Sequence, residues 1–342
     1  MYDIFILTHP PYFKFLKQHL ESIDYALGDR NTPVYLLAVK TSDEEETQLR
    51  NILKEVDLPL ELKVEKEGVT IGKSRNLLSS QGNSDWAIFL DSDTRICEDY
   101  FEQLENTIGI YGKTSDAFAG GIGTLESSKY GLYEGIMDLR VYLDKLKIPR
   151  QEFNQLLDSF DYDLLINGNE KKFYTSVKEK LSHLTGKETF ALQGFNQVIK
   201  RETLTELGGF AENLWSAEDR EMALRLNALG KTVTFIPQLW IDHLYDFSLK
   251  DIMRRKKIHG RWYAQIYREE NEDYLTDLPV LKLLIEKLAR SLKPHKPFNR
   301  NLNGRIYSAV ATFCYVGSFM KSQIEAGFTK IKGDSWTYDR DK

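Results

Sequence analysis

The sequence predicts an α/β fold: a doubly wound, mostly parallel sheet flanked by helices, with a helical insertion and a helical C-terminal extension. Three observations support this prediction. Apolar segments of strand length alternate with segments of helical periodicity over residues 1–125, as in sheets built from βαβ units. Residues 126–187 break this rhythm, which indicates an insertion. After His243 the chain becomes basic and helical.

Each expected element has its own local pattern. The expected strands are the apolar runs at residues 4–7, 34–39, 60–64, 86–90 and 117–122. Leu16, Leu20 and Ile23 recur at near-helical spacing and indicate the first helix. Ser42, with Glu45 three residues later, has the pattern of a capping box, so another helix should begin there. Residues 74–80 have a helical pattern, and residues 158–163 form a polar interruption of the insertion.

Composition limits the class of protein. The chain has 342 residues, of which 42% are hydrophobic and 28% charged, which is typical of a globular protein. Its net charge is −5, so we expect no nucleic-acid partner. The two cysteines, Cys97 and Cys314, are too few for a disulfide framework and favour a cytoplasmic protein.

No targeting or membrane-spanning segment is expected. The N-terminus lacks the basic region and the long apolar run of a signal peptide. The longest nearly uncharged run, residues 306–319, is shorter than the ~20 residues that a spanning helix needs.

The strand-like run 86–90 ends abruptly in Asp91-Ser92-Asp93. In open α/β sheets, ligands lie beyond the carboxyl ends of the strands, and side chains at positions i and i+2 of an extended segment point the same way. Two such carboxylates repel each other unless a cation binds them, and their oxygens suit Mg²⁺ or Mn²⁺, which also bind a diphosphate. A solvated turn explains these three residues equally well.

A second acidic group, Ser216-Ala217-Glu218-Asp219, precedes a helical pattern that ends near Gly230. The simpler interpretation makes Ser216 the N-cap and Asp219 the acidic residue at position N3 of the helix. In the alternative, Glu218 or Asp219 faces a cleft as the general base that deprotonates a sugar hydroxyl.

Four further features have alternative interpretations. Gly72-Lys73-Ser74 is not a P-loop, because Glu67 stands where the first glycine is required, but Lys73 or Arg75 at this helix start could contact phosphate. His243 is a structural histidine or a metal ligand. The basic run 254–257 is a solvated helix face, a grip on a diphosphate or an approach to anionic lipid. Residues 281–293 mix apolar and basic residues, which indicates a membrane-surface helix or a helix packed on its own domain or a dimer partner.

Taken together, five motifs resemble the inverting family 2 glycosyltransferases of the GT-A fold. In chain order they are Gly72-Lys73-Ser74-Arg75-Asn76, Ile88-Phe89-Leu90-Asp91-Ser92-Asp93, Gly194-Phe195-Asn196 followed by Leu207-Gly208-Gly209-Phe210, Glu218-Asp219 followed by Leu224-Arg225-Leu226, and Pro237 with His243. The resemblance covers residues 2–262. It implies that Asp93 and His243 bind Mn²⁺ or Mg²⁺, that Asp91 contacts the donor, and that Asp219 is the base.

The same resemblance suggests further binding residues. Thr8, Lys73 and Arg75 are expected to bind the donor together with Asp91 and Asp93, and Asn196 and Glu218 are expected to bind the acceptor. Family members often carry an acidic pair after the second strand, where this chain has Lys40-Thr41-Ser42-Asp43. Thr8 and Asp43 are therefore the candidates for contacting the nucleotide base.

The resemblance implies a metal-dependent single displacement with inversion. The donor would be a nucleotide-diphosphate-sugar and the acceptor a glycan or a lipid-linked glycan, in bacterial surface polysaccharide or glycoconjugate synthesis. The expected division is a nucleotide-sugar-binding half (1–125), a helical insertion (126–188), an acceptor-binding and catalytic half (189–250) and a basic helical extension (251–342). Peripheral contact with the inner face of the membrane and a homo-oligomeric state are further expectations.

Two alternative functions remain open. The first is a catalytically inactive nucleotide-sugar-binding protein whose insertion binds a partner, and the missing acidic pair is its best support. The second is a sugar nucleotidyltransferase, which Thr8-His9-Pro10-Pro11 disfavours because such enzymes usually carry a Gly-rich loop there.

Overall fold

The computed structural model describes residues 1–125, 128–269, 275–276, 297–299, 301–325 and 333–334. Internal contacts divide the chain into two compact units. Unit 1 comprises Met1–Thr124, Lys145–Lys147 and Lys178–Leu244, and unit 2 comprises Leu125–Asp144, Ile148–Val177 and Tyr245–Lys342.

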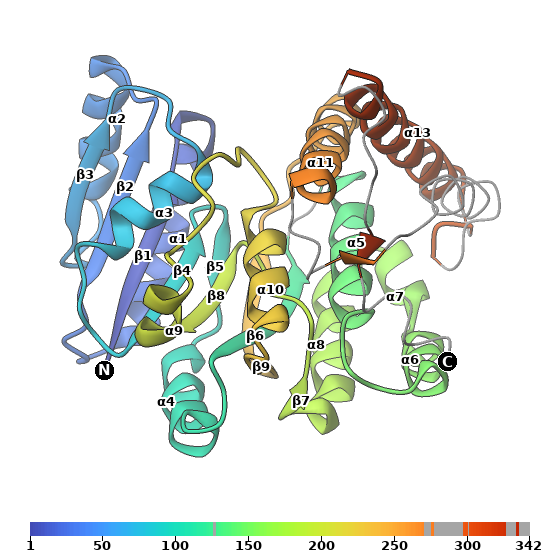
Figure 1. Cartoon of the computed structure of the whole chain (residues 1–342), viewed down its shortest axis with the longest axis horizontal. Helices are drawn as coiled ribbons and strands as arrows, with labels where there is room; N and C mark the ends of the chain where they lie inside the picture. The colour runs from blue at the N-terminus through green and yellow to red at the C-terminus, as the bar shows by residue number, and fades with distance from the viewer. Residues whose placement is uncertain (126–127, 270–274, 277–296, 300, 326–332, 335–342) are drawn as a thin grey trace. The chain divides into compact units, whose positions relative to one another are not determined.

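Unit 1 is built on a mostly parallel sheet (Figure 1). Its strands are β1 (Tyr2–Thr8), β2 (Val34–Val39), β3 (Glu61–Glu65), β4 (Trp86–Asp91), β5 (Thr94–Ile96), β6 (Ala117–Thr124), β7 (Lys187–Glu188), β8 (Asn196–Lys200) and β9 (Val233–His243). Their order is β3-β2-β1-β4-β8-β6-β9-β5, and β7 pairs with β9. The first four strands of this order are parallel neighbours, whereas β8 runs antiparallel to both β4 and β6.

The predicted doubly wound sheet is confirmed. All five expected strands are present, and their ends lie within two residues of the expected ends. Every residue of β2 is buried, because a parallel strand that is covered on both faces is apolar throughout.

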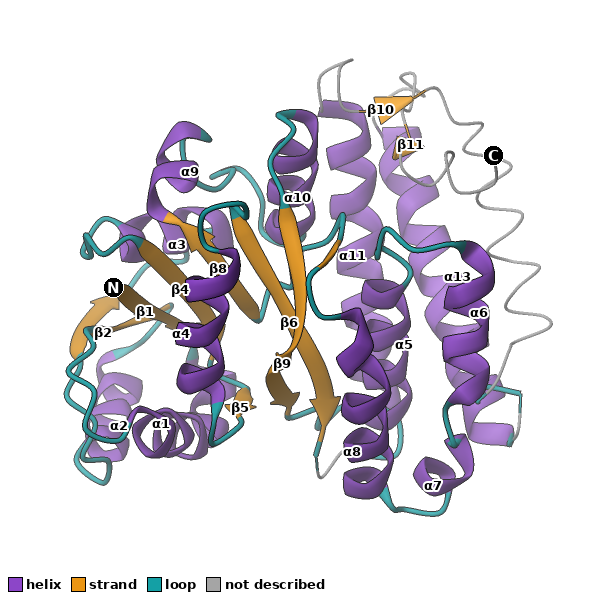
Figure 2. Ribbon diagram, turned by 90° about the horizontal axis from the view of Figure 1, so that it is seen from below, coloured by secondary structure: helices purple, strands orange, loops and turns teal. Residues whose placement is uncertain are grey.

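Helices cover both faces of this sheet. They are α1 (Phe13–Leu27), α2 (Asp43–Leu53), α3 (Ile71–Ser79), α4 (Tyr100–Tyr111), α9 (Arg201–Glu206) and α10 (Glu218–Ala228), with 3-10 turns η1 (Pro10–Tyr12) and η2 (Ser182–Leu184). Side chains alternate between the faces along a strand. Tyr2 stacks on Phe101 of α4, whereas the Phe5 ring lies 5.3 Å from the Arg201 guanidinium of α9. Figure 2 shows α3 and α9 on one side of the strands and α1 and α2 on the other.

The capping box expected at the start of α2 is confirmed. Ser42 Oγ accepts a hydrogen bond from the Glu45 amide (3.3 Å), and Glu45 Oε2 accepts one from the Ser42 amide (2.8 Å). These two bonds satisfy amide groups that have no partner within the helix.

Unit 2 is helical in its described part. Its helices are α5 (Gly131–Leu143), α6 (Arg150–Ser159), α7 (Tyr162–Ile166), α8 (Glu170–Leu181, which continues into unit 1), α11 (Leu249–Glu269) and α13 (Leu302–Glu325), with a strand pair β10 (Leu275–Thr276) and β11 (Gly333–Asp334). The expected polar interruption lies between α6 and α7, where Asp161 accepts a hydrogen bond from the Asp163 amide (3.2 Å). The helical character predicted for the insertion and the extension is confirmed for the residues that the structure describes.

A buried carboxylate joins three helices of unit 2. Glu134 of α5 accepts hydrogen bonds from Lys256 of α11 and Tyr307 of α13, both at 2.6 Å. Burial alone would raise the pKa of Glu134, but Lys256 and Arg255 lower it to about 2. Arg255 and Lys256 thus face Glu134, while Arg254 is 76% exposed. The basic run 254–257 is therefore not one solvated face.

Two expectations concern the membrane. Among the helices of the described ranges, none combines the length and the apolar character needed to cross a membrane. The pattern predicted at residues 281–293 lies outside the described residues.

Candidate active site

The turn between β4 and β5 is held by hydrogen bonds from its neighbours. Thr94 Oγ1 donates to the Asp91 carbonyl (2.8 Å), and Ser92 Oγ donates to Thr8 Oγ1 (2.8 Å). His19 of α1 donates from Nδ1 to the Thr94 carbonyl (2.8 Å). Burial lowers the pKa of His19 to about 4, so this imidazole is neutral at pH 7. The turn therefore presents its acidic residues from a fixed position at the carboxyl end of β4.

Asp93 and His243 lie next to each other in this turn region. Antiparallel pairing of β5 with β9 sets Thr94 opposite His243, and His243 Nε2 lies 3.7 Å from Asp93 Oδ1. The side chains are only 8% and 3% exposed. A distance of 3.7 Å is shorter than two metal–ligand bonds of about 2.1 Å each, so one ion can contact both atoms.

This pair would be an open metal site. In the part of the chain that the structure describes, no group of three or more His, Cys, Asp or Glu residues is arranged to hold a metal ion. Mg²⁺ and similar ions usually keep several positions for water and substrate phosphates. The donor set thus fits an ion that a diphosphate helps to bind, rather than a closed structural site.

Arg75 of α3 connects three segments of the site. Its Nη1 lies 2.8 Å from Glu218 Oε1, and its Nη2 lies 3.2 Å from Asp91 Oδ1 and donates to the Gly194 carbonyl. Its side chain is 3% exposed. Burial lowers the pKa of Arg75, but Glu218, Asp91 and Asp219 outweigh it and raise the pKa. Arg75 therefore has a structural role, and its contact with the donor stays a prediction.

The expected N-cap of α10 is wrong. Ala217, not Ser216, precedes the helix; it has a left-handed φ of 67° and makes no side-chain cap. Asp219 therefore occupies the second helical position. Its Oδ2 accepts from the Gly194 amide (3.1 Å) and its Oδ1 from the Arg220 amide (2.8 Å). The expected end of the helix is confirmed, because Gly230 follows it with a φ of 67°.

A short segment links Asp219 to Asp91 and His243. The Gly194 amide bonds Asp219 and its carbonyl accepts from Arg75. The Phe195 carbonyl accepts from the Asp91 amide (3.4 Å), and the Phe195 ring packs edge-on against His243 at 5.3 Å. Gly194 permits this approach, because an added Cβ would lie 3.3 Å from Asp219 Oδ2.

Glu218 yields a pH-dependent prediction. Burial, with smaller effects of Asp219 and Asp91, raises its pKa to about 7 against the opposing effect of Arg75. In the unfolded chain Glu218 has its ordinary pKa of 4.5 and has largely lost its proton at pH 5. The folded protein loses this proton only between pH 5 and 8, so its free energy of unfolding falls as pH rises through this range. In Glu218→Gln this titration is absent. The free energy of unfolding of the variant relative to wild type should rise by about 1–3 kcal/mol over this range.

Urea denaturation at each pH unit from 5 to 8 measures this difference. Glu202→Gln removes an exposed carboxylate of α9 and should show no such trend. A variant-to-wild-type difference that stays constant with pH would contradict the raised pKa of Glu218.

Thr8 is buried beside the Asp91–Asp93 turn, where its Oγ1 accepts a hydrogen bond from Ser92. Three other expected site residues do not converge with these groups. Asn196 is buried, accepts from Tyr100 OH (2.6 Å) and donates to the Leu239 carbonyl (3.0 Å), so this geometry does not support an acceptor contact. Lys73 is exposed on α3, and Asp43 pairs with Lys66 (2.7 Å) at the start of α2.

Sequence analysis missed one feature near the site. Lys40 and Ala217 are the non-glycine residues with positive φ in the described ranges, at 55° and 67°. Such a conformation costs about 1–2 kcal/mol per residue and tends to persist at functional sites. Trp215, two positions before Ala217 and 4.9 Å from Lys40 Nζ at its ring centre, is 42% exposed. Backbone strain leaves no signal in the sequence, but an aromatic residue just before an acidic helix start could have been noted.

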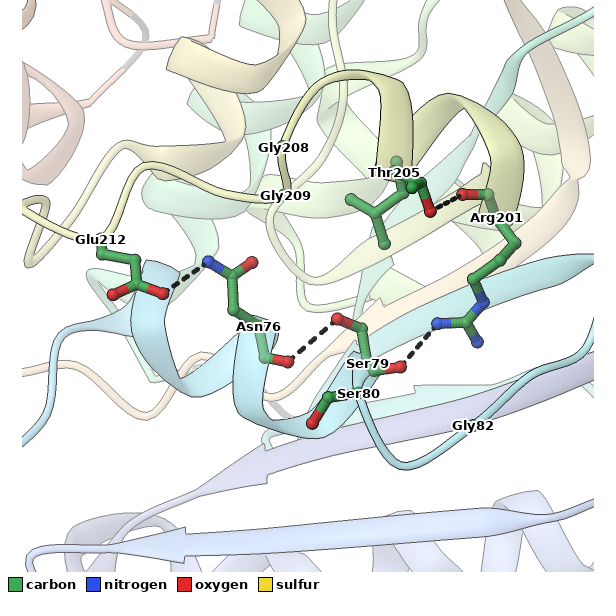
Figure 3. A pocket seen from close by; sticks show the side chains of 10 residues that line it. Asn76, Ser79, Ser80, Gly82, Arg201, Thr205, Gly208, Gly209 and Glu212 are labelled. Atoms are coloured by element: carbon green, nitrogen blue, oxygen red, sulfur yellow. Dashed lines mark hydrogen bonds between the residues drawn. The ribbon is translucent and has the colours of Figure 1, made fainter.

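A separate hollow lies between α3 and α9 (Figure 3). It has a volume of about 400 Å³. Asn76 at its edge donates to the Phe210 carbonyl and to Glu212, both at 3.0 Å. Arg201 donates to the Ser79 carbonyl (2.7 Å) and to Asp3 (2.9 Å). These groups hold the protein together, so the hollow supports no assignment of a ligand.

A solved structure shares this fold. PcManGT from Pyrobaculum calidifontis, a mannosyltransferase solved in complex with GDP-Man and Mn²⁺, aligns over 92% of this chain and 86% of its own, with a TM-score of 0.52 and 15% identity. This chain therefore shares the fold of that solved structure. A structure of TarS 1–349 from S. aureus in complex with UDP aligns over 95% of this chain and 91% of its own, with a TM-score of 0.45 and 11% identity. No family model matches this chain, and no curated protein matches it in sequence.

Proposed function

We propose that this protein is an inverting, metal-dependent glycosyltransferase. It would move a sugar from a nucleotide-diphosphate-sugar to a glycan or lipid-linked acceptor. The observation that carries the proposal is the junction at Gly194 and Phe195, which contacts Asp219 on one side and Asp91 and His243 on the other. The proposed metal ligands, Asp93 and His243, thus lie near a second carboxylate, that of Asp219. Displacement at a sugar carbon needs both a metal that stabilises the leaving group and a base. The acceptor class and a place in surface glycoconjugate synthesis rest on the family resemblance alone.

Each side of the site has its own task in this reaction. Asp93 and His243 would hold Mn²⁺ or Mg²⁺, which offsets the negative charge that grows on the leaving diphosphate. The acceptor oxygen bonds to the anomeric carbon while the bond to the diphosphate breaks, and the diphosphate keeps that electron pair. Asp219 takes the proton of the acceptor hydroxyl. Its two backbone hydrogen bonds fix its orientation, and an ionised carboxylate has lone pairs left for this proton.

A donor screen tests the proposal. The purified protein is titrated with UDP- and GDP-sugars, with and without Mn²⁺, and slow release of the nucleoside diphosphate is followed. One donor is expected to bind in a Mn²⁺-dependent manner and to be hydrolysed slowly. Asp93→Asn should weaken this binding about tenfold or more, a factor that corresponds to about 1.4 kcal/mol.

Asp85→Asn is the matched control. Asp85 precedes the other end of β4, and its side chain is 82% exposed, so donor binding should not change. Donor binding without hydrolysis or transfer to any acceptor would favour the inactive nucleotide-sugar-binding protein. Binding of no donor at all would contradict both functions.

A further inference from the structure

We infer that the exposed ring of Trp215, held by Lys40, is the surface on which the nucleobase of the donor stacks, an inference that rests on the proposed function. Trp215 lies in the loop between α9 and α10, three positions before Glu218. The residue is 42% exposed, although its side chain is one of the largest apolar ones. An exposed aromatic ring in a loop that leads into the acidic end of the site is a binding surface for a flat ligand.

Lys40 holds one face of this ring. Its Nζ lies 4.9 Å from the centre of the Trp215 ring, within the range of a cation–π contact. The stem of Lys40 packs against Gly68, where an added Cβ would lie 2.5 Å from Lys40 Cε. Lys40 thus acts as a positioning residue, and the exposed part of the ring remains for a ligand.

The segments that carry Lys40 and Trp215 each contain a strained backbone position, and the Trp215 loop is also anchored by a hydrogen bond. The positive φ angles of Lys40 and Ala217 lie on the two sides of the contact. The Thr70 hydroxyl donates to the Glu212 carbonyl (2.6 Å), which ties the loop to the start of α3. The loop therefore keeps Trp215 beside Lys40, the residue that follows β2. Strain of this kind persists only where the surroundings enforce it, often at ligand sites.

The position of the ring suits a base whose phosphates lie near Asp93. Asp91 pairs with Leu7 across β4 and β1, and Leu7 pairs with Leu37 across β1 and β2. Lys40, just after β2, and the Asp91–Asp93 turn therefore lie along the same edge of the sheet. Two strand spacings of about 4.8 Å each separate them laterally by about 10 Å, comparable to the reach of a ribose and its base.

Local charge favours a nucleotide over a neutral sugar. The carboxylates that suit sugar hydroxyls, Glu218 and Asp219, begin α10, whereas the Trp215 ring has an ammonium group beside it. An anionic nucleotide gains from this cation, and a neutral sugar does not. Stacking on an aromatic ring accepts any base, so it supplies affinity without the acidic pair that is missing after β2.

Nucleotide titration tests the inference. UDP and GDP are added to wild type in the presence of Mn²⁺, and binding is followed by calorimetry and by quenching of tryptophan fluorescence. Trp215→Ala should weaken binding of the nucleotide that wild type prefers about tenfold or more, and Trp215→Phe should keep it within about threefold because a ring remains. Lys40→Ala should weaken binding about threefold, and Lys40→Arg should restore it, since guanidinium keeps the cation–π contact. The quenching should disappear in Trp215→Phe although the nucleotide still binds.

Tyr25→Ala, which removes a 69% exposed ring from α1, is the matched control and should bind as wild type does. Circular dichroism and melting curves should show that the variants are folded, because the substituted rings are exposed. Equal nucleotide affinity of Trp215→Ala and wild type would overturn the inference and leave the proposed function standing. The inference would also be overturned if Trp215→Ala kept its nucleotide affinity but had a raised KM for the acceptor, because the ring would then bind the acceptor. If wild type binds neither nucleotide, the proposed function fails first.

Discussion

Replacing Asp219 with Asn is expected to slow sugar transfer roughly 10²- to 10⁴-fold, the usual contribution of a positioned general base. The amide keeps the size of the side chain and can accept one of the two backbone hydrogen bonds, from Gly194 or Arg220. It cannot take the proton of the acceptor hydroxyl. Donor affinity should stay unchanged, because Asp93 and His243 are intact.

Steady-state kinetics with calorimetry of donor binding separates these two effects. Glu212→Gln is the matched control: this carboxylate lies in the loop before α10 and bonds Asn76, and its removal should leave turnover within about twofold. Normal turnover of Asp219→Asn would refute the assignment of the base. A loss of donor affinity instead would move Asp219 to the donor side.

Replacing Arg75 with Met is expected to destabilise unit 1 by about 3–5 kcal/mol at pH 8, because a buried charge then loses its partner. Glu218 lies 2.8 Å from Arg75, and the two side chains are 5% and 3% exposed. At pH 8 Glu218 of wild type is largely ionised, since its pKa is about 7. Arg75 lowers this pKa, so without Arg75 the pKa of Glu218 rises, and the buried carboxylate is left unpaired or must take up a proton. At pH 6 the loss should be smaller, because protonation removes the unpaired charge.

Urea denaturation at both pH values measures the effect. Arg254→Met removes a guanidinium whose side chain is 76% exposed and should cost no more than about 0.5 kcal/mol. Adding Glu218→Gln to Arg75→Met should recover part of the loss at pH 8, which a double-mutant cycle quantifies. If Arg75→Met and Arg254→Met are equally stable, the buried ion pair contributes nothing to the fold.

Much of the sheet is predictable from the sequence, because buried parallel strands are continuous apolar runs. This holds for β1, β2 and β4, where nearly every residue is buried. By contrast, β5 has three residues and β7 has two, which is too short for any periodicity. Their pairing with β9 depends on contacts far apart along the chain.

The site was only partly predictable, because it too depends on contacts between residues far apart along the chain. Motifs single out Asp93, His243 and Asp219, but the pairing that sets His243 opposite Thr94 is a property of the folded sheet. The Arg75–Glu218 ion pair joins helices α3 and α10, and no local pattern reveals it. The interpretation of Ser216 as an N-cap failed because Ala217 adopts a left-handed conformation that its residue type does not favour.

The junction at Gly194 and Phe195 would make the two halves of the proposed chemistry interdependent. Gly194 bonds Asp219, the proposed base, Phe195 packs against the His243 imidazole, and a nearly inextensible backbone of about 3.8 Å per residue joins them. A shift of a few tenths of an ångström at either end is thus transmitted to the other. A change in donor preference during evolution would therefore also shift the proposed base, and donor and acceptor specificity would change together.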